Sequence, residues 1–168
     1  GNLSSLAVKI SALTHELQKE RGATNLFLGS KGTEFASEVS EQRKESDKRI
    51  IDLKTFITGF DSEAYGIEFK SSLLSAVGRL DDIKNKRDAA TSLDVPADKI
   101  FSYYTELVDS MLTVISHMSL LSERSEISNQ IAAYYNFLQA KERAGLERGF
   151  MSKVFAQDKF DAGGLKRF

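Results

Sequence analysis

The chain of 168 residues contains a single proline, Pro96. Proline interrupts helices because it lacks a backbone N–H and clashes with the preceding turn, so folds rich in turns usually contain several prolines. A chain with so few turn signals is therefore predicted to form long helices, and not a β-sandwich or an α/β fold. Pro96 itself follows Asp94 and Val95, which end one predicted helix, and it suits the first turn of the next.

Apolar residues recur at alternating spacings of three and four, the period of an amphipathic helix. The first such stripe is Leu3, Leu6, Ile10, Leu13 and Leu17. Five helices are predicted on this basis, over about residues 3–28, 33–58, 67–93, 97–121 and 126–157. Each would be about 37 to 48 Å long. The predicted fold is all-α, an elongated antiparallel bundle of about five long helices with a four-helix-bundle-like core.

Composition excludes several classes of protein. The 23 Lys and Arg residues are balanced by 24 Asp and Glu residues, for a net charge of −1, which gives no support to nucleic acid as a partner of this domain. The absence of cysteine excludes disulfides, zinc–thiolate sites and cysteine nucleophiles. No apolar run approaches the roughly 18 residues of a membrane span. We expect one domain, residues 1–168, with no cofactor and no metal.

Catalytic patterns are also missing from the sequence. Only two histidines occur, His15 and His117. His15-Glu16 begins like the H-E-x-x-H helix of a zinc protease, but Lys19 stands where the second histidine is needed. The sequence has no glycine-rich phosphate loop after a strand, no G-x-S-x-G motif and no evident pair of nucleophile and base. The protein is therefore predicted not to be an enzyme.

A basic-glycine motif occurs near both ends of the chain. The sequence Glu-Arg-Gly is present at residues 20–22 and again at residues 147–149. A glycine inside a helix costs about 1 kcal/mol relative to alanine. Gly22, Gly145 and Gly149, all within predicted helices, therefore suggest close packing or a functional role.

The arginines of this motif lie near apolar helix faces. Arg21 is about 40° from Leu17 around the first predicted helix, and Thr24 lies on the same side. On the last predicted helix, Arg148 flanks the glycine patch, whereas Arg143 faces away from it. A partly buried arginine needs a counter-charge, because burying it alone is costly.

Two interpretations of Arg21 and Arg148 follow from this need. In the first, they form ion pairs that fix the register of the helices, with partners among Glu20, Glu142 and Glu147. In the second, the two arginines converge on a small anion above a floor cleared by glycines. Two parallel N–H groups of a guanidinium match two oxygens of a planar oxyanion.

Three segments of the sequence together resemble the NIT domain, the nitrate- and nitrite-sensing domain of bacterial receptors. The first is HELQKERG at residues 15–22, followed by FLGS at residues 27–30. The second is Gln42-Arg43 with Asp47 after it, and the third is KERAGLER at residues 141–148. They occur in the family's order and cover the chain from about residue 10 to about residue 160.

The resemblance implies an all-helical sensor. In this family the domain usually lies in the periplasm, between two transmembrane helices of a chemoreceptor, histidine kinase or cyclic-di-GMP enzyme. Some members are soluble and carry an RNA-binding antiterminator module. In nitrate-binding members an arginine of the opening motif and one of the late motif contact the anion, and the matching residues here are Arg21 and Arg148, with Arg143 as the alternative.

Departures from the family pattern carry their own implications. Family domains continue with more helix after the late motif, so the resemblance implies either a C-terminally truncated form or a short member. Thr24 stands where members often have serine, and it keeps the hydroxyl. Gly149 stands where members often have alanine, which widens the floor and could admit a different ligand.

From these observations we expect the periplasmic sensor domain of a membrane-anchored receptor, such as a chemotaxis receptor. It would bind nitrate or nitrite between its first and last helices and would form a homodimer. The candidate ligand-binding residues are Arg21, Thr24, Arg143 and Arg148, and the candidate close-packing residues are Gly22, Gly145 and Gly149. Two alternatives stay open: a structural or partner-binding helical module, and a NIT-like sensor for another small molecule, such as an amine or amino acid.

Overall fold

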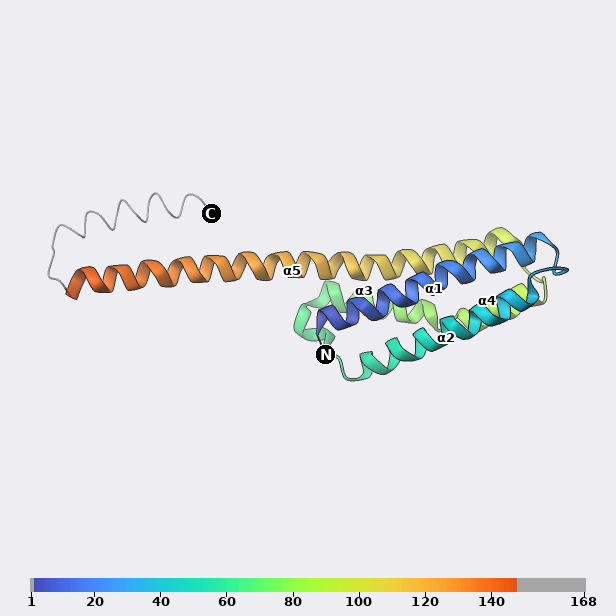
Figure 1. Cartoon of the computed structure of the whole chain (residues 1–168), viewed down its shortest axis with the longest axis horizontal. Coiled ribbons are helices and arrows are strands. Elements are labelled where there is room, and N and C mark those ends of the chain that lie inside the picture. Colours follow the sequence, from blue (N-terminus) through green and yellow to red (C-terminus); the bar gives the residue numbers. More distant parts are fainter. Residues whose placement is uncertain (1, 148–168) are drawn as a thin grey trace. The chain divides into compact units, whose positions relative to one another are not determined.

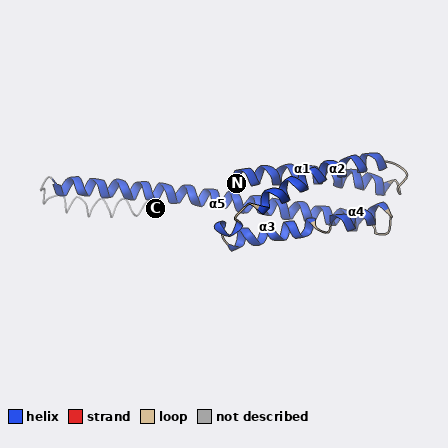
Figure 2. Cartoon of the chain, turned by 90° about the horizontal axis from the view of Figure 1, so that it is seen from below, coloured by secondary structure: helices blue, strands red, loops and turns tan. Residues whose placement is uncertain are grey.

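A computed structural model describes residues 2–147 of the chain, and this part contains helices and no strand (Figures 1 and 2). The all-α prediction is confirmed. The chain divides into two compact units, Gly1–Leu120 and Leu121–Phe168. Arg148 and Gly149, two of the candidate residues, lie outside the described residues.

The first unit is built from antiparallel helices. Helix α1 spans Leu3–Gly29 and packs against α2, Ala36–Thr58, which runs back in the opposite direction (Figure 1). A short 3₁₀ helix, Ser62–Tyr65, leads into α3, Ile67–Leu80, and α4, Ile83–Thr91. Helix α5, Ala97–Glu147, begins directly after Pro96 and supplies its first 24 residues to this unit.

The structure differs from the predicted helices at two places. The first lies within the predicted helix 67–93. The chain breaks there at Asp81-Asp82, between α3 and α4. Aspartate disfavours helix interiors because its carboxylate competes for local hydrogen bonds. Here Asp81 binds Lys54 Nζ at 2.6 Å, and Asp82 accepts a hydrogen bond from Asn85 at 3.1 Å.

The second difference is at residues 122–125, where a junction between two helices was predicted but α5 continues without a break. The junction sequence is Ser-Glu-Arg-Ser, which is polar but contains neither proline nor glycine. Polar residues of this kind are tolerated on a solvated helix face, so polarity alone does not end a helix.

The core of the first unit includes the apolar stripe predicted for α1 from Leu6 onward. Leu6, Ile10, Leu13 and Leu17 of α1 have no exposed surface. The other helices also contribute buried residues, among them Val39 and Leu53 of α2, Phe69, Leu73 and Leu80 of α3, Ile83 of α4, and Ile100, Tyr104, Leu107 and Met111 of α5. The α1 stripe continues with the polar residues Glu20 and Thr24, which are also buried. The hydrophobic core therefore leads directly into a polar cluster.

Replacing Leu17 by alanine tests the buried face of α1. Leu17 has no exposed surface, whereas Leu26 on the same helix is 54% exposed. We expect Leu17→Ala to lower the free energy of unfolding by about 2–5 kcal/mol, because it leaves a cavity in the core. Leu26→Ala should change it by about 0.5 kcal/mol or less. Urea denaturation followed by circular dichroism measures both, and equal losses would contradict this orientation of α1.

Candidate functional site

Arg21 lies on α1 and faces α5. Its Nη1 donates a hydrogen bond to Thr105 Oγ1 at 3.2 Å, and its Cζ lies 5.2 Å from the centre of the Phe101 ring. The side chain is half-buried. Among residues 2–147, no carboxylate oxygen lies within the 4.0 Å of an ion pair with Arg21. Arg21 is therefore a positioned guanidinium without a counter-ion in this part of the chain.

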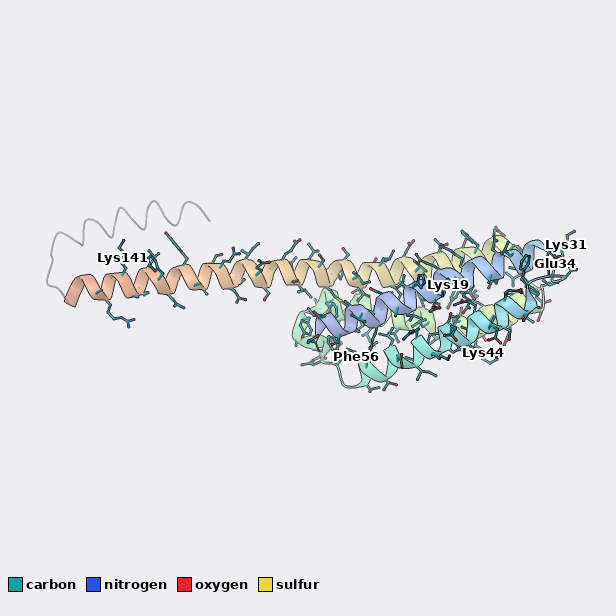
Figure 3. All side chains as sticks on the ribbon, viewed as in Figure 1. Lys19, Lys31, Glu34, Lys44, Phe56 and Lys141 are labelled. Atoms are coloured by element: carbon teal, nitrogen blue, oxygen red, sulfur yellow. The ribbon has the colours of Figure 1, made fainter. Side chains whose placement is uncertain are left out.

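The neighbouring carboxylate, Glu20, has a different set of partners. Arg87 of α4 binds it through two bonds, Nε to Oε2 at 3.0 Å and Nη2 to Oε1 at 2.7 Å. The Tyr104 hydroxyl of α5 donates a third hydrogen bond to Oε2. Consecutive helical residues point about 100° apart, so Glu20 turns inward while Arg21 turns toward the edge of α5. Figure 3 marks this turn of α1 by the label of the preceding residue, Lys19.

These contacts belong to a larger group, called here the Glu20 network, which consists of Glu20, Arg43, Asp47, Arg87 and Tyr104. Arg87 Nη1 binds Asp47 Oδ1 of α2 at 2.6 Å. Arg43 of α2 donates to the Arg87 carbonyl oxygen at 3.1 Å and to Thr91 Oγ1 at 2.9 Å. The network thus joins α1, α2, α4 and α5.

Burial and charge set the protonation states in the network. Burial alone would lower the pKa of the Arg87 guanidinium, but the hydrogen bonds and charges of Glu20 and Asp47 outweigh it and raise that pKa above its ordinary value. Burial, followed by the charge of Glu20, raises the pKa of Tyr104 above its ordinary value. Arg87 therefore stays charged, and Tyr104 keeps the proton that it donates to Glu20.

Thr24 lies one turn after Glu20 and is 1% exposed. It is close enough to Tyr104 to lower the pKa of that hydroxyl slightly against the larger upward shift. Its Oγ1 nevertheless has no hydrogen bond of normal geometry within the described part of the chain. Thr24 thus borders the Glu20 network, and its role in ligand binding stays a prediction.

The predicted site residues of the late motif belong to the second unit or lie outside the described residues. Arg143 lies on α5 in the second unit and is exposed, and Gly145 is in the same helix. Arg148 and Gly149 lie outside the described range, so the convergence of two arginines stays a prediction. Glu20, one of the partners considered for Arg21 in the ion-pair interpretation, binds Arg87 instead. The reason is the direction in which each side chain leaves the helix.

Gly22 does not show the predicted close packing within residues 2–147. A β-carbon added there would meet no atom within 4 Å. The residue lies on the exposed face of α1, away from the core stripe. If Gly22 packs closely against a neighbour, that neighbour lies outside the described residues, and this packing stays a prediction.

Sequence reasoning missed Arg87 and the hydrogen bond of Tyr104. Arg87 belongs to the charged run KNKRD, which is typical of a solvated helix face. A usable signal was present on the other partner, because Glu20 continues the spacing Leu13, Leu17, Glu20, Thr24 of the buried stripe. A carboxylate at a core position needs a cationic partner from another helix.

The family model described as "Nitrate and nitrite sensing" matches residues 12–168. The chain belongs to the NIT family. It is 27% identical over 157 residues to the nitrate regulatory protein of Klebsiella oxytoca, across 93% of this chain and 39% of that protein. It also resembles the solved structure of the NasR transcription antiterminator, with a TM-score of 0.66 and 26% identity, across 85% of this chain and 39% of that one. This NIT chain therefore spans about two fifths of the length of these relatives.

The relatives correct the prediction of a receptor. Both are regulators by name, and one is a transcription antiterminator. The expected transmembrane receptor, with its chemotaxis role, its periplasmic location and its membrane-anchored parent, is therefore wrong. The prediction that this domain has no nucleic-acid partner is contradicted on the same ground, since one relative is by its name a transcription antiterminator. The three motifs could not decide this, because all of them lie within the region that matches the sensing family.

Three further findings bear on these predictions. Within residues 2–147 no helix combines the length and the hydropathy that crossing a bilayer requires. The matched relatives of this NIT chain are regulatory proteins and not enzymes. Among residues 2–147, no group of three His, Asp or Glu residues is arranged to hold a metal ion.

Tyr104→Phe tests the hydrogen bond to Glu20. We expect it to lower the free energy of unfolding at pH 7 by about 1–3 kcal/mol, because a buried carboxylate loses a donor. Folding raises the pKa of Tyr104 above its unfolded value of 10.0. The stabilisation linked to this proton is therefore fully present below pH 10.0, and it is lost as the pH rises from there through the pKa of the folded state. The difference between the two proteins should therefore shrink above about pH 10.

Urea denaturation between pH 7 and pH 11 measures this effect. Tyr65→Phe is the control, since Tyr65 stacks on Phe60 with ring centres 5.5 Å apart and its hydroxyl has no hydrogen bond within the described residues. Similar losses for the two variants at pH 7 would contradict the assigned role of Tyr104.

Gly22→Ala tests the close-packing prediction. Because the described residues leave open space at this position, the substitution should raise the free energy of unfolding by about 1 kcal/mol through helix propensity alone. Thermal and urea denaturation measure the change. A loss of stability would instead show that a neighbour outside residues 2–147 packs on Gly22.

Proposed function

We propose that this NIT chain is the sensing part of a nitrate-responsive regulator of transcription, and that it binds nitrate or nitrite through Arg21. The observation that carries the proposal is the half-buried guanidinium of Arg21, which has no carboxylate partner among residues 2–147. The names of the two relatives, a nitrate regulatory protein and a transcription antiterminator, support the same function. The chain acts by binding, without catalysis of its own.

The surroundings of Arg21 suit a small planar oxyanion. A guanidinium carries five N–H donors, and the hydrogen bond to Thr105 involves Nη1. The remaining donors can form two parallel bonds to two oxygens of one anion. The Phe101 ring, which is 44% exposed, lies beside the guanidinium and adds a cation–π contact that helps to fix its position.

The late motif supplies the second cation in this proposal. Arg148 takes this role, with Arg143 as the alternative, and Gly145 and Gly149 leave backbone clear for the ligand. Thr24 offers a hydroxyl beside the Glu20 network. Without an anion the two guanidinium groups repel each other, and with an anion they are drawn together.

Binding at Arg21 acts first on α5, since both side chains that hold the guanidinium, Phe101 and Thr105, belong to that helix. The same helix continues to Glu147 and carries the beginning of the late motif. An anion can shift such a system only by the difference in its affinity for two arrangements of the helices. α5 is therefore the element that passes the signal on.

Anion binding is tested by the thermal midpoint of the protein in nitrate or nitrite, compared with chloride and sulfate at matched ionic strength. An anion present at about 100 times its dissociation constant should add about 2.7 kcal/mol of stability. Arg21→Ala and Arg148→Ala should each abolish the shift. Arg49→Ala is the matched control, because Arg49 is exposed and its one ion pair among residues 2–147 is with Asp52, three residues further along α2.

The outcomes separate the remaining interpretations. A loss of stability in Arg21→Ala, together with an unchanged nitrate shift, would favour a structural role for this residue. A shift with an amine or amino acid in place of nitrate would favour a different ligand.

The regulatory part of the proposal needs a separate experiment. We would replace the matching region of the Klebsiella oxytoca nitrate regulatory protein by this chain and measure nitrate-dependent transcription. We expect a nitrate response that Arg21→Ala removes and Arg49→Ala retains. A hybrid that binds nitrate but gives the same transcription with and without it would contradict the regulatory role.

A further inference from the structure

Two consecutive residues of α1 carry opposite charges and bind separate partners. Glu20 has no exposed surface and binds Arg87 and Tyr104, whereas Arg21 is held by Thr105 and Phe101. A carboxylate next to a guanidinium normally weakens the binding of an external anion, since it cancels the charge that attracts the anion. Anion binding at Arg21 therefore depends on what neutralises Glu20.

Arg87 is the group that neutralises it. Its two bonds to Glu20, at 3.0 and 2.7 Å, form the bidentate geometry that is strongest between a guanidinium and a carboxylate. The Arg87 side chain is only 12% exposed, so solvent screens this pair poorly. Asp47, which binds the third nitrogen of Arg87, is 52% exposed and is screened much more.

We infer that Arg87 determines the anion affinity of Arg21 by occupying and neutralising Glu20. This inference rests on the proposed function of Arg21. Arg87 is a positioning residue that does not touch the anion. It holds the Glu20 carboxylate on the side of α1 that faces α4, and it leaves the charge of Arg21 uncompensated.

The charges around this turn of α1 predict the direction in which each substitution changes the anion affinity. The Glu20 network together with Arg21 contains three guanidinium groups, of Arg21, Arg43 and Arg87, and two carboxylates, of Glu20 and Asp47. One positive charge is therefore in excess. Removing the charge of Arg87 balances the group, whereas removing the charge of Glu20 leaves two positive charges in excess. The two substitutions should act on anion affinity in opposite directions.

The test is isothermal titration of the protein with sodium nitrate at low ionic strength. We expect Arg87→Met to weaken nitrate binding about tenfold or more and Glu20→Gln to strengthen it by a few-fold, from the gain or loss of one nearby charge. Arg87→Lys keeps the charge and loses the bidentate fork, so it should bind nitrate within about threefold of the wild type. Circular dichroism establishes that each variant is folded at the titration temperature.

A purely structural role makes a different prediction. Glu20→Gln and Arg87→Met break the same buried pair, so both would weaken nitrate binding together, and that outcome would overturn the inference. If Arg87→Met does not fold, the sign of the effect in Glu20→Gln decides alone. A wild-type protein that binds no nitrate would overturn the proposed function and the inference with it, whereas binding that depends on Arg21 but not on Arg87 or Glu20 would overturn the inference alone.

Discussion

The buried carboxylate of Glu20 is the constraint around which the first unit is arranged. It has no exposed surface and takes its hydrogen bonds from Arg87 of α4 and Tyr104 of α5. Separating a buried ion pair costs about 3–5 kcal/mol, because one charge is left without compensation. Packings that rotate α1 or shift α4 along it would incur this cost, so the pair selects one register among several that the apolar stripes would permit.

The same constraint gives two adjacent charged residues different roles. Glu20 joins the helices, and Arg21, one residue later, keeps a guanidinium without a carboxylate partner in the described part of the chain. The family model is described as nitrate and nitrite sensing, which supports the proposal that Arg21 binds the anion. The names of the relatives, a nitrate regulatory protein and a transcription antiterminator, contradict the expected receptor. Motifs in a sensing domain describe the ligand site, and they carry no information on the module that responds to it.

Much of the fold could be predicted from local sequence. The stripe from Leu6 to Leu17 is buried as its spacing indicated, and α5 begins directly after Pro96. The errors arose where a boundary depended on weaker signals. Asp81-Asp82 ends a helix through side-chain hydrogen bonds, one of them to Lys54 of another helix, and residues 122–125 do not end one despite their polarity.

The candidate site divides in the same way. The sequence by itself determined the all-α class and the buried face of α1, and it singled out Arg21 as a candidate ligand-binding residue, because helical periodicity and short motifs are properties of consecutive residues. Only the tertiary structure decided that Glu20 pairs with Arg87, 67 residues away along the chain, and that Arg21 rests against Thr105 and Phe101. The physical reason is that a charged residue in a helix shows its own need for a partner, whereas the choice of partner depends on which turns of distant helices the packing places side by side.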